Sequence, residues 1–232
     1  MKTFINYYGA KFRIGKMYPY PSCNVIVEPF AGGAGYSLRH YQKKVFLYEK
    51  NQSIAEMWKW LISATEDDVM SLPVDFDSLD DIDVPQGAKV LIGFCLNTGT
   101  VTPCKTRSKW ANQYETSEQF WGDKRRKRIA SQVSLIKHWE CYKVSDYTDI
   151  PNIEATWFID PPYQKQGQFY PNGSKDIDFI HLSNWCHSRQ GELIVCEQDG
   201  ADWMRWTNKK NVKANAKTKT SMEVWMHRGL NR

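Results

Sequence analysis

The stretch Ala155-Thr156-Trp157-Phe158-Ile159, followed directly by Asp160-Pro161-Pro162-Tyr163, decides the expected fold. Aromatic and β-branched residues in an unbroken apolar run predict a short strand that is buried on both faces. The two prolines end this strand, because neither can donate a backbone hydrogen bond to a neighbouring strand. A carboxylate and an aromatic ring are therefore expected at the carboxyl edge of a sheet, where open α/β folds bind their ligands.

A second strand-to-turn pattern lies near the start of the chain. The apolar residues Val25 to Val27 lead into Glu28-Pro29-Phe30-Ala31-Gly32-Gly33-Ala34-Gly35. Glycines allow the backbone to turn sharply and to approach a ligand closely. Residues 36–41 are expected to begin a helix whose free N–H groups face that ligand. The pattern predicts a nucleotide-type ligand in an α/β sheet, with an ordinary tight turn as the alternative.

The next predicted strand, Val45 to Tyr48, ends at Glu49. An acid about 20 residues beyond a glycine-rich turn is suitably placed to accept hydrogen bonds from both hydroxyls of a ribose. The dinucleotide pattern G-x-G-x-x-G is incomplete, because Leu38 stands where the third glycine belongs, and the sequence contains no G-K-[ST] motif. A nucleoside without a pyrophosphate is therefore expected, which points to S-adenosylmethionine.

The alternation of apolar segments along the chain predicts a doubly wound, Rossmann-like α/β sheet. Asp146 and Tyr147 follow one of the later strands and could hold an adenine ring; the alternative is that Asp146 only starts a turn. Residues 164–175 are expected to form a flap over the site. Further strands are expected at 141–144, 193–196 and 222–227, and helices at 90–97, 124–138 and 178–189.

The net charge of +5 is unevenly distributed. Residues 66–83 are acidic, and the stretch 63–87 around them is expected to form a loop-rich surface connection. Residues 105–128 and 205–219 are basic and contain interleaved aromatic residues. Two such basic runs favour a nucleic-acid partner, although basic runs are usually only solvated surface. Residues 98–122 are expected to form loops that could include a hairpin, and 205–219 an exposed loop. In the helix predicted at 124–138, the basic residues are expected on the face opposite the apolar ones.

Cysteine and histidine spacing argues against a metal site. The six cysteines form no C-x-x-C pair and the five histidines are scattered, so buried thiols and no metal are expected. No stretch approaches the roughly 20 apolar residues that span a bilayer, and the first 14 residues lack the apolar segment of a secretory signal. We therefore expect a cytoplasmic protein with no membrane partner, present as a monomer or weak dimer.

Three motifs, in this order along the chain, resemble those of the Dam-like DNA adenine methyltransferases of bacteria and phages. They are Asn6-Tyr7-Tyr8-Gly9-Ala10-Lys11, Glu28-Pro29-Phe30-Ala31-Gly32-Gly33 and Asp160-Pro161-Pro162-Tyr163. The resemblance implies a methyltransferase domain made of residues 1–62 and 139–232, with a small basic target-recognition insertion at 63–138. Ala10 replaces the family's second glycine, Ala34 interrupts the glycine turn, and residues 98–122 match the family poorly.

The resemblance also implies roles for individual residues. Asp160 and Tyr163, with Pro161 and Pro162 between them, would meet an adenine flipped out of double-stranded DNA. Tyr163 would stack on that base, with Phe169 or Tyr170 of the flap as possible partners. The residues implied to hold S-adenosylmethionine are Tyr7, Lys11, Glu28, Phe30, Ala31, Gly32, Gly33, Glu49, Lys50, Asp146, Tyr147 and Asp160. The residues implied to contact DNA are Asn97, Lys105, Arg107, Lys109, Lys124, Arg125, Arg126 and Arg128.

The chemistry explains why a carboxylate is needed at the strand end. The exocyclic amine of adenine is a poor nucleophile, because its lone pair is delocalised into the ring. If Asp160 and a proline carbonyl accept its two N–H groups, the lone pair is directed at the methyl group of a sulfonium. The alternatives are the same reaction on adenine in RNA or on cytosine in DNA, a non-catalytic DNA-binding protein with this fold, and a nicotinamide dehydrogenase. In related enzymes an Asp at this position favours adenine over cytosine.

Overall fold

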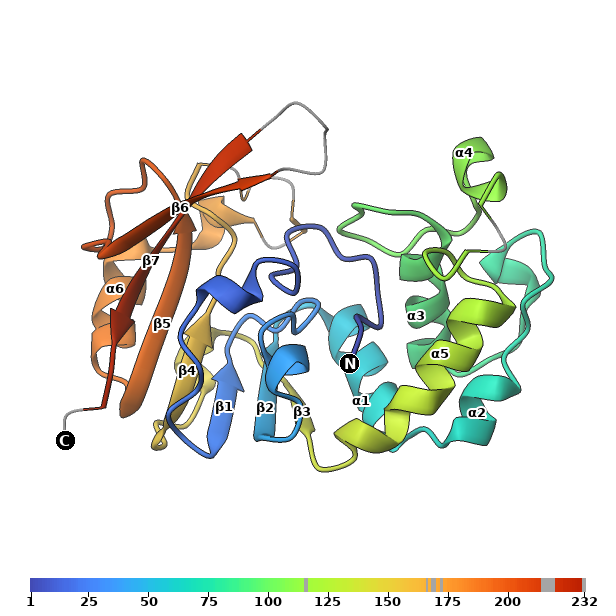
Figure 1. Cartoon of the computed structure of the whole chain (residues 1–232), viewed down its shortest axis with the longest axis horizontal. Helices are drawn as coiled ribbons and strands as arrows, with labels where there is room; N and C mark the ends of the chain where they lie inside the picture. Colours follow the sequence, from blue (N-terminus) through green and yellow to red (C-terminus); the bar gives the residue numbers. More distant parts are fainter. Residues whose placement is uncertain (115–116, 166, 168–169, 172, 214–219, 231–232) are drawn as a thin grey trace.

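The computed structural model of the chain describes residues 1–114, 117–165, 167, 170–171, 173–213 and 220–230. Among these residues, seven strands form one mixed sheet in the order β3-β2-β1-β4-β5-β7-β6 (Figure 1). Strands β1 to β5 are parallel, whereas β7 is antiparallel to both β5 and β6. The strands are β1 Val25–Glu28, β2 Lys44–Glu49, β3 Glu140–Lys143, β4 Ala155–Ile159, β5 Gly191–Gln198, β6 Asn208–Lys213 and β7 Thr220–Arg228. The predicted α/β class is confirmed, and the mainly parallel sheet is compatible with a Rossmann-like fold.

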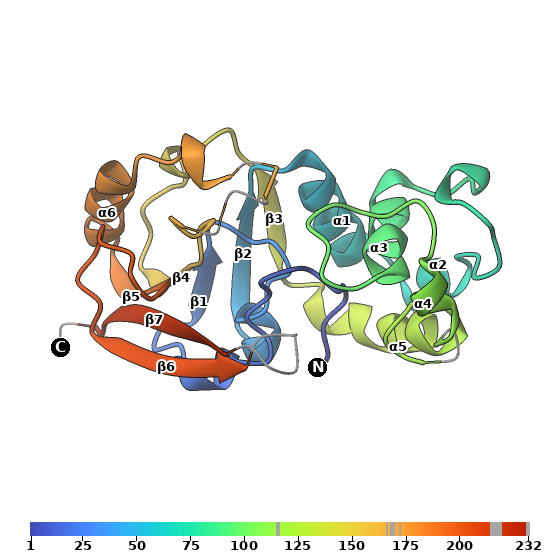
Figure 2. The ribbon, with the colours of Figure 1, turned by 90° about the horizontal axis from the view of Figure 1, so that it is seen from above.

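Helices cover the sheet, and a further group of helices lies beside one of its edges (Figures 1 and 2). In both views of the molecule, α2 to α5 gather beside the β3 edge, and the β6–β7 hairpin lies at the opposite end with α6 (Figures 1 and 2). The α-helices are α1 Gln52–Ser63, α2 Glu66–Met70, α3 Gln86–Leu96, α4 Lys109–Asn112, α5 Asp123–Val133 and α6 Phe179–His187. Short 3₁₀ helices occur at Gly15–Met17, Ser37–His40, Leu79–Asp81, Ser134–Ile136, Tyr147–Asp149 and Ser174–Asp176. Within the described part of the chain, no helix is both long and apolar enough to cross a membrane.

The core has two layers, one on each face of the sheet. Phe158 of β4 belongs to the cluster that contains the buried side chains of α1 and α3. Its neighbour Trp157 points to the other face and belongs to the cluster around Trp185 of α6. All five residues of β4 are buried, because successive side chains alternate between two covered faces. The prediction of a strand buried on both faces is confirmed for β4.

The basic stretch 205–219 was expected to be an exposed loop, and this expectation is wrong for its first half. Residues 208–213 form β6, which pairs with β7 from Asn208↔Trp225 to Lys213↔Thr220; residues 214–219 lie outside the described part. The polar sequence of β6 has a low β propensity, and pairing with β7 overrides it. An edge strand tolerates such a sequence because one of its sides faces solvent.

The region between residues 63 and 138 is more helical than expected. Helix α2 begins at a capping box formed by Thr65 and Asp68, a start signal contained within the acidic run. The described residues of 98–122 contain the short helix α4 and no hairpin. The helix expected at 36–41 is only the 3₁₀ helix Ser37–His40. The helices expected at 90–97, 124–138 and 178–189 are present as α3, α5 and α6.

Candidate functional site

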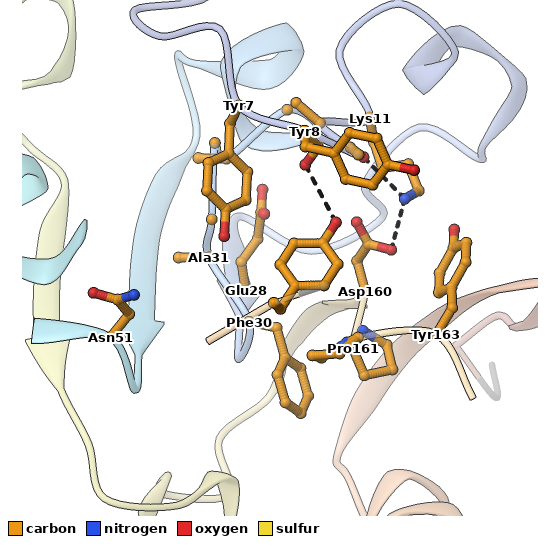
Figure 3. Close-up of a pocket in the computed structure, with 18 of the residues that line it drawn as sticks. Tyr7, Tyr8, Lys11, Glu28, Phe30, Ala31, Asn51, Asp160, Pro161 and Tyr163 are labelled. Atoms are coloured by element: carbon orange, nitrogen blue, oxygen red, sulfur yellow. Dashed lines mark hydrogen bonds and ion pairs between the residues drawn. The ribbon is translucent and has the colours of Figure 1, made fainter. Parts of the chain in front are cut away.

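A cavity of about 880 Å³ lies at the carboxyl ends of β1 and β4 (Figure 3). Glu28 ends β1, and Asp160 directly follows β4. These strands are neighbours in the sheet but not in the sequence, so the strand order reverses between them. Such a switch point is where open α/β sheets bind ligands. The volume lies in the upper part of the usual range for small-molecule sites, roughly 300–1,000 Å³.

The cavity brings together the predicted catalytic and cofactor-binding residues from five separate stretches of sequence. Those that line it are Tyr7, Lys11, Glu28, Phe30, Ala31, Gly32, Gly33, Glu49, Lys50, Asp146, Tyr147, Asp160, Pro161, Pro162 and Tyr163. The predicted DNA-binding residues lie elsewhere, although Trp110 of the inserted region reaches the cavity wall. The sequence motifs therefore converge on one place, as the predicted sheet requires.

The glycine turn makes room for the protein's own N-terminal segment. A Cβ atom on Gly35 would lie 2.5 Å from the backbone nitrogen of Phe12 and 2.7 Å from that of Lys11. A Cβ atom on Gly33 would lie 3.2 Å from Cβ of Tyr7. The sequence predicts that these glycines let a ligand approach closely. In the structure, the absence of side chains at Gly33 and Gly35 also leaves room for the N-terminal segment that carries Tyr7 and Lys11. Ala34 adopts a φ of +47°, a left-handed conformation that is unfavourable for a residue with a Cβ.

Glu49 fixes the start of this turn. One carboxylate oxygen accepts the N–H of Gly32 at 2.9 Å and the other accepts that of Asn51 at 2.8 Å. Trp58 of α1 donates its indole N–H to the carbonyl of Gly32 at 2.8 Å. Burial raises the pKa of Glu49, and the backbone N–H donors oppose this effect. Because each oxygen has a second lone pair, the fixed carboxylate can accept further hydrogen bonds from a ligand in the cavity.

Asp146 and Tyr147 approach the cavity from the end of β3. The carboxylate of Asp146 accepts the N–H of Thr148 at 3.1 Å and caps the 3₁₀ helix Tyr147–Asp149. The ring of Tyr147 lies 6.0 Å from that of Phe30, and its hydroxyl contacts Nδ1 of His181 at 2.7 Å. Asp146 does start a turn, as the alternative reading of the sequence holds, and both residues also line the cavity.

Lys11 is a buried cation in the middle of the site (Figure 3). Its Nζ lies 2.8 Å from Oδ1 of Asp160 and 3.8 Å from Oε1 of Glu223, and it donates to the carbonyl of Gly9 at 3.1 Å. The same nitrogen lies 4.6 Å from the centre of the Tyr163 ring. Only 7% of the Lys11 side chain is exposed, so these groups replace water as its surroundings.

Glu223 of β7 is a site residue that the sequence interpretation missed. Its Oε1 accepts hydrogen bonds from the hydroxyls of Tyr163 and, at 2.9 Å, of Tyr18. The residue is 5% exposed. A signal was present in the sequence, because Glu223 is the one acid in the apolar run Met222 to Met226. An unsupported carboxylate is costly inside a sheet, and this favours a specific role for it.

Burial sets the protonation of the site. It raises the pKa of Asp160 to about 6, with Glu223 adding to the effect and Lys11 opposing it. It also raises the pKa of Glu28 to about 8, against a hydrogen bond of 2.8 Å from the N–H of Ser37. For Lys11, burial alone would lower the pKa, but Asp160 and Glu223 raise it above its ordinary value. At pH 7, Lys11 is charged, Asp160 is mostly ionised and Glu28 is mostly protonated.

Tyr170, from the segment expected to be a flap, contacts the N-terminal segment across the cavity. Its hydroxyl donates to the carbonyl of Tyr8 at 3.2 Å (Figure 3), and its ring lies 6.1 Å from that of Tyr7. The other aromatic residue considered there, Phe169, lies outside the described residues. Tyr170 thus joins the two chain segments that border the cavity.

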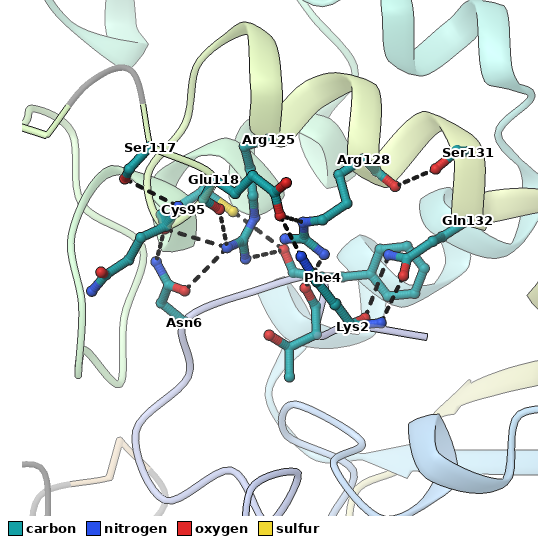
Figure 4. Close-up of polar contacts among 12 residues, drawn as sticks. Lys2, Phe4, Asn6, Cys95, Ser117, Glu118, Arg125, Arg128, Ser131 and Gln132 are labelled. Carbon is teal, nitrogen blue, oxygen red and sulfur yellow. Dashed lines mark hydrogen bonds and ion pairs between the residues drawn. The ribbon is translucent and has the colours of Figure 1, made fainter.

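The basic residues of α5 were expected on its outer face; this holds for the exposed Lys124 and Lys127 but is wrong for the arginines, of which Figure 4 shows Arg125 and Arg128. Arg125 is 3% exposed and donates to the carbonyls of Phe4, Glu118 and Gln119. Arg126 donates to the carbonyl of Leu72, and Arg128 donates to that of Thr3. Direct DNA contact by Arg125 is therefore ruled out by its burial, and Arg126 and Arg128 are largely buried structural residues.

The other predicted DNA-binding residues differ in exposure. Asn97 cross-links the loop that follows α3, since its amide donates to the carbonyl of Thr106 and accepts the N–H of Ser108. Arg107 donates to the carbonyl of Trp121, and exposed Lys105 pairs with Asp80 at 2.8 Å. Lys109 and Lys124 are exposed. Fewer basic side chains in this region are exposed to a polyanion than the sequence suggests.

Within the described part of the chain, no group of three or more His, Cys, Asp or Glu side chains is arranged to hold a metal ion. The cavity is lined by fixed carboxylates, aromatic rings and the buried ammonium of Lys11. No protein-family model matches this chain, and no curated protein is significantly similar to it.

Proposed function

We propose that the protein transfers a methyl group from S-adenosylmethionine to the exocyclic amine of adenine in DNA, and that its sheet is a Rossmann-like methyltransferase sheet. One observation carries the proposal. The carboxylate of Asp160, the ring of Tyr163 and the turn at Gly32 border the same cavity at the switch point of the sheet. The motif resemblance supplies the reaction class, and this convergence supports it.

The residues around the cavity fit a sulfonium nucleoside. Glu49 presents a fixed carboxylate with spare acceptor capacity, which suits a ribose diol. The rings of Phe30 and Tyr147 offer apolar surface for an adenine, with Asp146 beside them as an acceptor for its amine. Tyr7 and Lys11, on the segment seated on the glycine turn, would face the amino-acid end.

A dinucleotide fits less well, which disfavours a dehydrogenase. The N–H of Gly32 is already bound to Glu49, and the turn leads into a 3₁₀ helix of four residues instead of a full α-helix. Pyrophosphate sites use free N–H groups at the start of an α-helix. Beyond β5 the sheet continues as the antiparallel hairpin β6–β7, so the second mononucleotide-binding half of a dinucleotide fold is missing from the described residues.

When bound, S-adenosylmethionine supplies an electrophilic methyl group on a sulfonium. The protein's part is to position the nucleophile: Asp160 and the carbonyl of a following proline would accept the two N–H groups of the amine. Positive charge develops on that nitrogen, and the ionised Asp160 stabilises it. Tyr163 would stack on the base, a contact that contributes on the order of 1–3 kcal/mol.

The depth of the site implies an extruded base. The Asp160 side chain is only 20% exposed, so an amine inside a duplex could not reach it. Enzymes that modify bases solve this problem by flipping the nucleotide out of the stack. The exposed Lys109 and Lys124 would then contribute to holding the phosphate backbone.

The test is methyl transfer from labelled S-adenosylmethionine to unmethylated DNA, followed by digestion to nucleosides. We expect the label in N6-methyladenine. Asp160→Ala should lose methyl transfer, by about 100-fold or more, because the amine loses its charged acceptor. It should largely keep cofactor binding, measured by calorimetry, since Glu49 and the glycine turn are unchanged.

The same assay separates the alternatives. Label in N4-methylcytosine, or in RNA in place of DNA, would change the substrate and keep the chemistry. DNA binding without label in any nucleoside, together with no binding of S-adenosylmethionine, would indicate a non-catalytic protein. Full activity of Asp160→Ala would refute the proposed mechanism.

A further inference from the structure

Lys11 contacts both side chains that the proposed function assigns to the target base. Its ammonium lies 2.8 Å from Oδ1 of Asp160, so it already neutralises the carboxylate whose negative charge the amine of the base needs. It also lies 4.6 Å from the centre of the Tyr163 ring, the surface on which the base would stack. A base that stacks on that side of the ring and uses the charge of Asp160 therefore requires the ammonium to move.

A displaced Lys11 needs another partner inside the protein. A buried charge that loses its counter-ion is strongly destabilising, and only 7% of this side chain is exposed. Oε1 of Glu223 is 3.8 Å away, so a shift of about 1 Å would bring the ammonium to direct ion-pair distance. Glu223 therefore lies next to the position that Lys11 must leave.

Glu223 is also bound to the ring in question. The hydroxyl of Tyr163 donates to Glu223 Oε1, and that of Tyr18 donates to the same oxygen at 2.9 Å. The carboxylate lies on β7, and Tyr163 follows β4; in the sheet these two strands are separated by β5. One side chain thus contacts both the cation and the aromatic residue of the catalytic motif.

We propose that Glu223 is a positioning residue that takes over the ammonium of Lys11 when the target base enters, and that it holds the Tyr163 ring in its stacking orientation. This inference depends on the proposed function. In the absence of DNA, Lys11 is paired with Asp160 beside the Tyr163 ring. In its presence, Lys11 and Glu223 form a neutral pair, and the negative charge of Asp160 is left for the amine.

The charges of the site support this division of roles. Two acidic side chains, Asp160 at 2.8 Å and Glu223 at 3.8 Å, lie around the ammonium of Lys11. With Asp160 alone, the ammonium and the developing cation on the amine would compete for a single carboxylate. The second carboxylate removes that competition.

The experiment compares Glu223→Gln with the wild type in methyl transfer to unmethylated plasmid DNA. The amide oxygen can still accept from Tyr163, but it carries no charge. We expect KM for DNA to rise about tenfold or more, the usual effect of losing one charged hydrogen-bond partner, with the affinity for S-adenosylmethionine unchanged. The acid limb of the pH profile should move to lower pH, because the negative charge of Glu223 raises the pKa of Asp160.

Two further variants separate positioning from stability. Glu223→Asp keeps the charge, so the acid limb should return to its wild-type position. Glu192→Gln removes another buried carboxylate near the opposite end of β5, where it accepts from Thr156 and Ser22. This control should leave both KM and the acid limb unchanged.

A folded Glu223→Gln protein with wild-type KM and an unmoved acid limb would overturn the inference. If Glu223→Gln does not fold, Glu223→Asp decides: its shorter reach should raise KM, and an unchanged KM is the contrary result. If the wild type transfers no methyl group, the proposed function fails, and NMR of the Lys11 ammonium in ¹⁵N-lysine-labelled protein still tests the pair. A Lys11 signal that does not change between wild type and Glu223→Gln would show that the two side chains are not coupled.

Discussion

Asp160 shows how one residue acquires its properties from its neighbours. In water its carboxyl group would titrate near 4; here burial and Glu223 raise its pKa to about 6, although Lys11 opposes them. The protonated acid binds an amine less well, because it has lost its charge and part of its acceptor capacity. Under the proposed function the ionised form is the active one, so methyl transfer requires Asp160 to be deprotonated.

We therefore predict that kcat/KM for methyl transfer falls as the pH drops through about 6, with little change between pH 7 and 8 on account of this group. The raised pKa places the loss about two pH units above that of an ordinary aspartate. A pH–rate profile from pH 5 to 8 measures it. A rate that stays constant down to pH 5 would contradict the assignment of Asp160 as the acceptor.

Gly35 is the position in the glycine turn that is least tolerant of an added side chain. A methyl group there would lie 2.5 Å from the backbone nitrogen of Phe12, and backbone cannot move aside as a side chain can. We predict that Gly35→Ala destabilises the protein by roughly 1–3 kcal/mol. It should also weaken binding of S-adenosylmethionine, because the added methyl group displaces the segment that carries Tyr7 and Lys11. Urea unfolding and calorimetry measure the two effects.

Gly229→Ala is the matched control, since a Cβ there meets nothing within 4 Å. If the two variants behave equally in both measurements, the close contact between the turn and the N-terminal segment contributes neither to the stability of the protein nor to cofactor binding.

At the scale of single residues, the sequence predicts much of the site but not its centre. Motif residues such as Asp160 and Glu49 are recognisable because each follows an apolar strand. Glu223 comes from a strand 63 residues after Asp160, and nothing local says that β7 lies two places from β4 in the sheet. The contact between Lys11 and the catalytic motif likewise depends on the path of the N-terminal segment across the cavity.

Among the elements, helix α5 combines an expected structure with an unexpected role. Its helical pattern and its apolar face are confirmed, yet Arg125 is buried and bound to backbone carbonyls of the N-terminal segment and of the 118–119 loop. Periodicity tells which residues share a face, but not which irregular segment packs there. The N-terminal segment has no periodicity of its own, so its docking against α5 could not be predicted from the sequence.

We predict that Arg125→Met destabilises the protein by about 2–4 kcal/mol, because several buried carbonyls lose their donor. Lys127→Met, on the same helix, should have little effect, since Lys127 is exposed and its ion-pair partner Asp123 is exposed as well. Denaturant unfolding of both variants measures the difference. A stability loss at Lys127 as large as at Arg125 would mean that helix propensity, and not the buried network, is responsible.

A strand was predicted well where burial requires an apolar sequence. It was predicted poorly where the strand is held mainly by its hydrogen bonds to a neighbouring strand. Strand β4 begins and ends where its apolar run does, because two covered faces demand such residues. Strand β6 is polar and exists through its hydrogen bonds to β7. Its partner is separated from it by residues 214–219, and composition alone suggests a loop.

On the scale of the whole molecule, the cavity and the exposed Lys109 and Lys124 belong to different regions of the chain. If DNA spans both, its affinity should depend on salt through the exposed cations. We predict that Lys109→Ala and Lys124→Ala each reduce the slope of log K against log salt by about 0.9, whereas Arg125→Met leaves the slope unchanged. Titrations from 50 to 200 mM salt measure the slope; equal slopes for all variants would place the DNA elsewhere.

The position of β6 at the outer edge of the sheet has a consequence for how molecules of this protein behave in a crowded solution. An edge strand exposes unpaired N–H and C=O groups that could extend into a second molecule. Lys209 and Lys210 are exposed on this strand, so two such edges meet with like charges and repel each other. The hairpin that delivers Glu223 to the site thus also carries built-in resistance to aggregation.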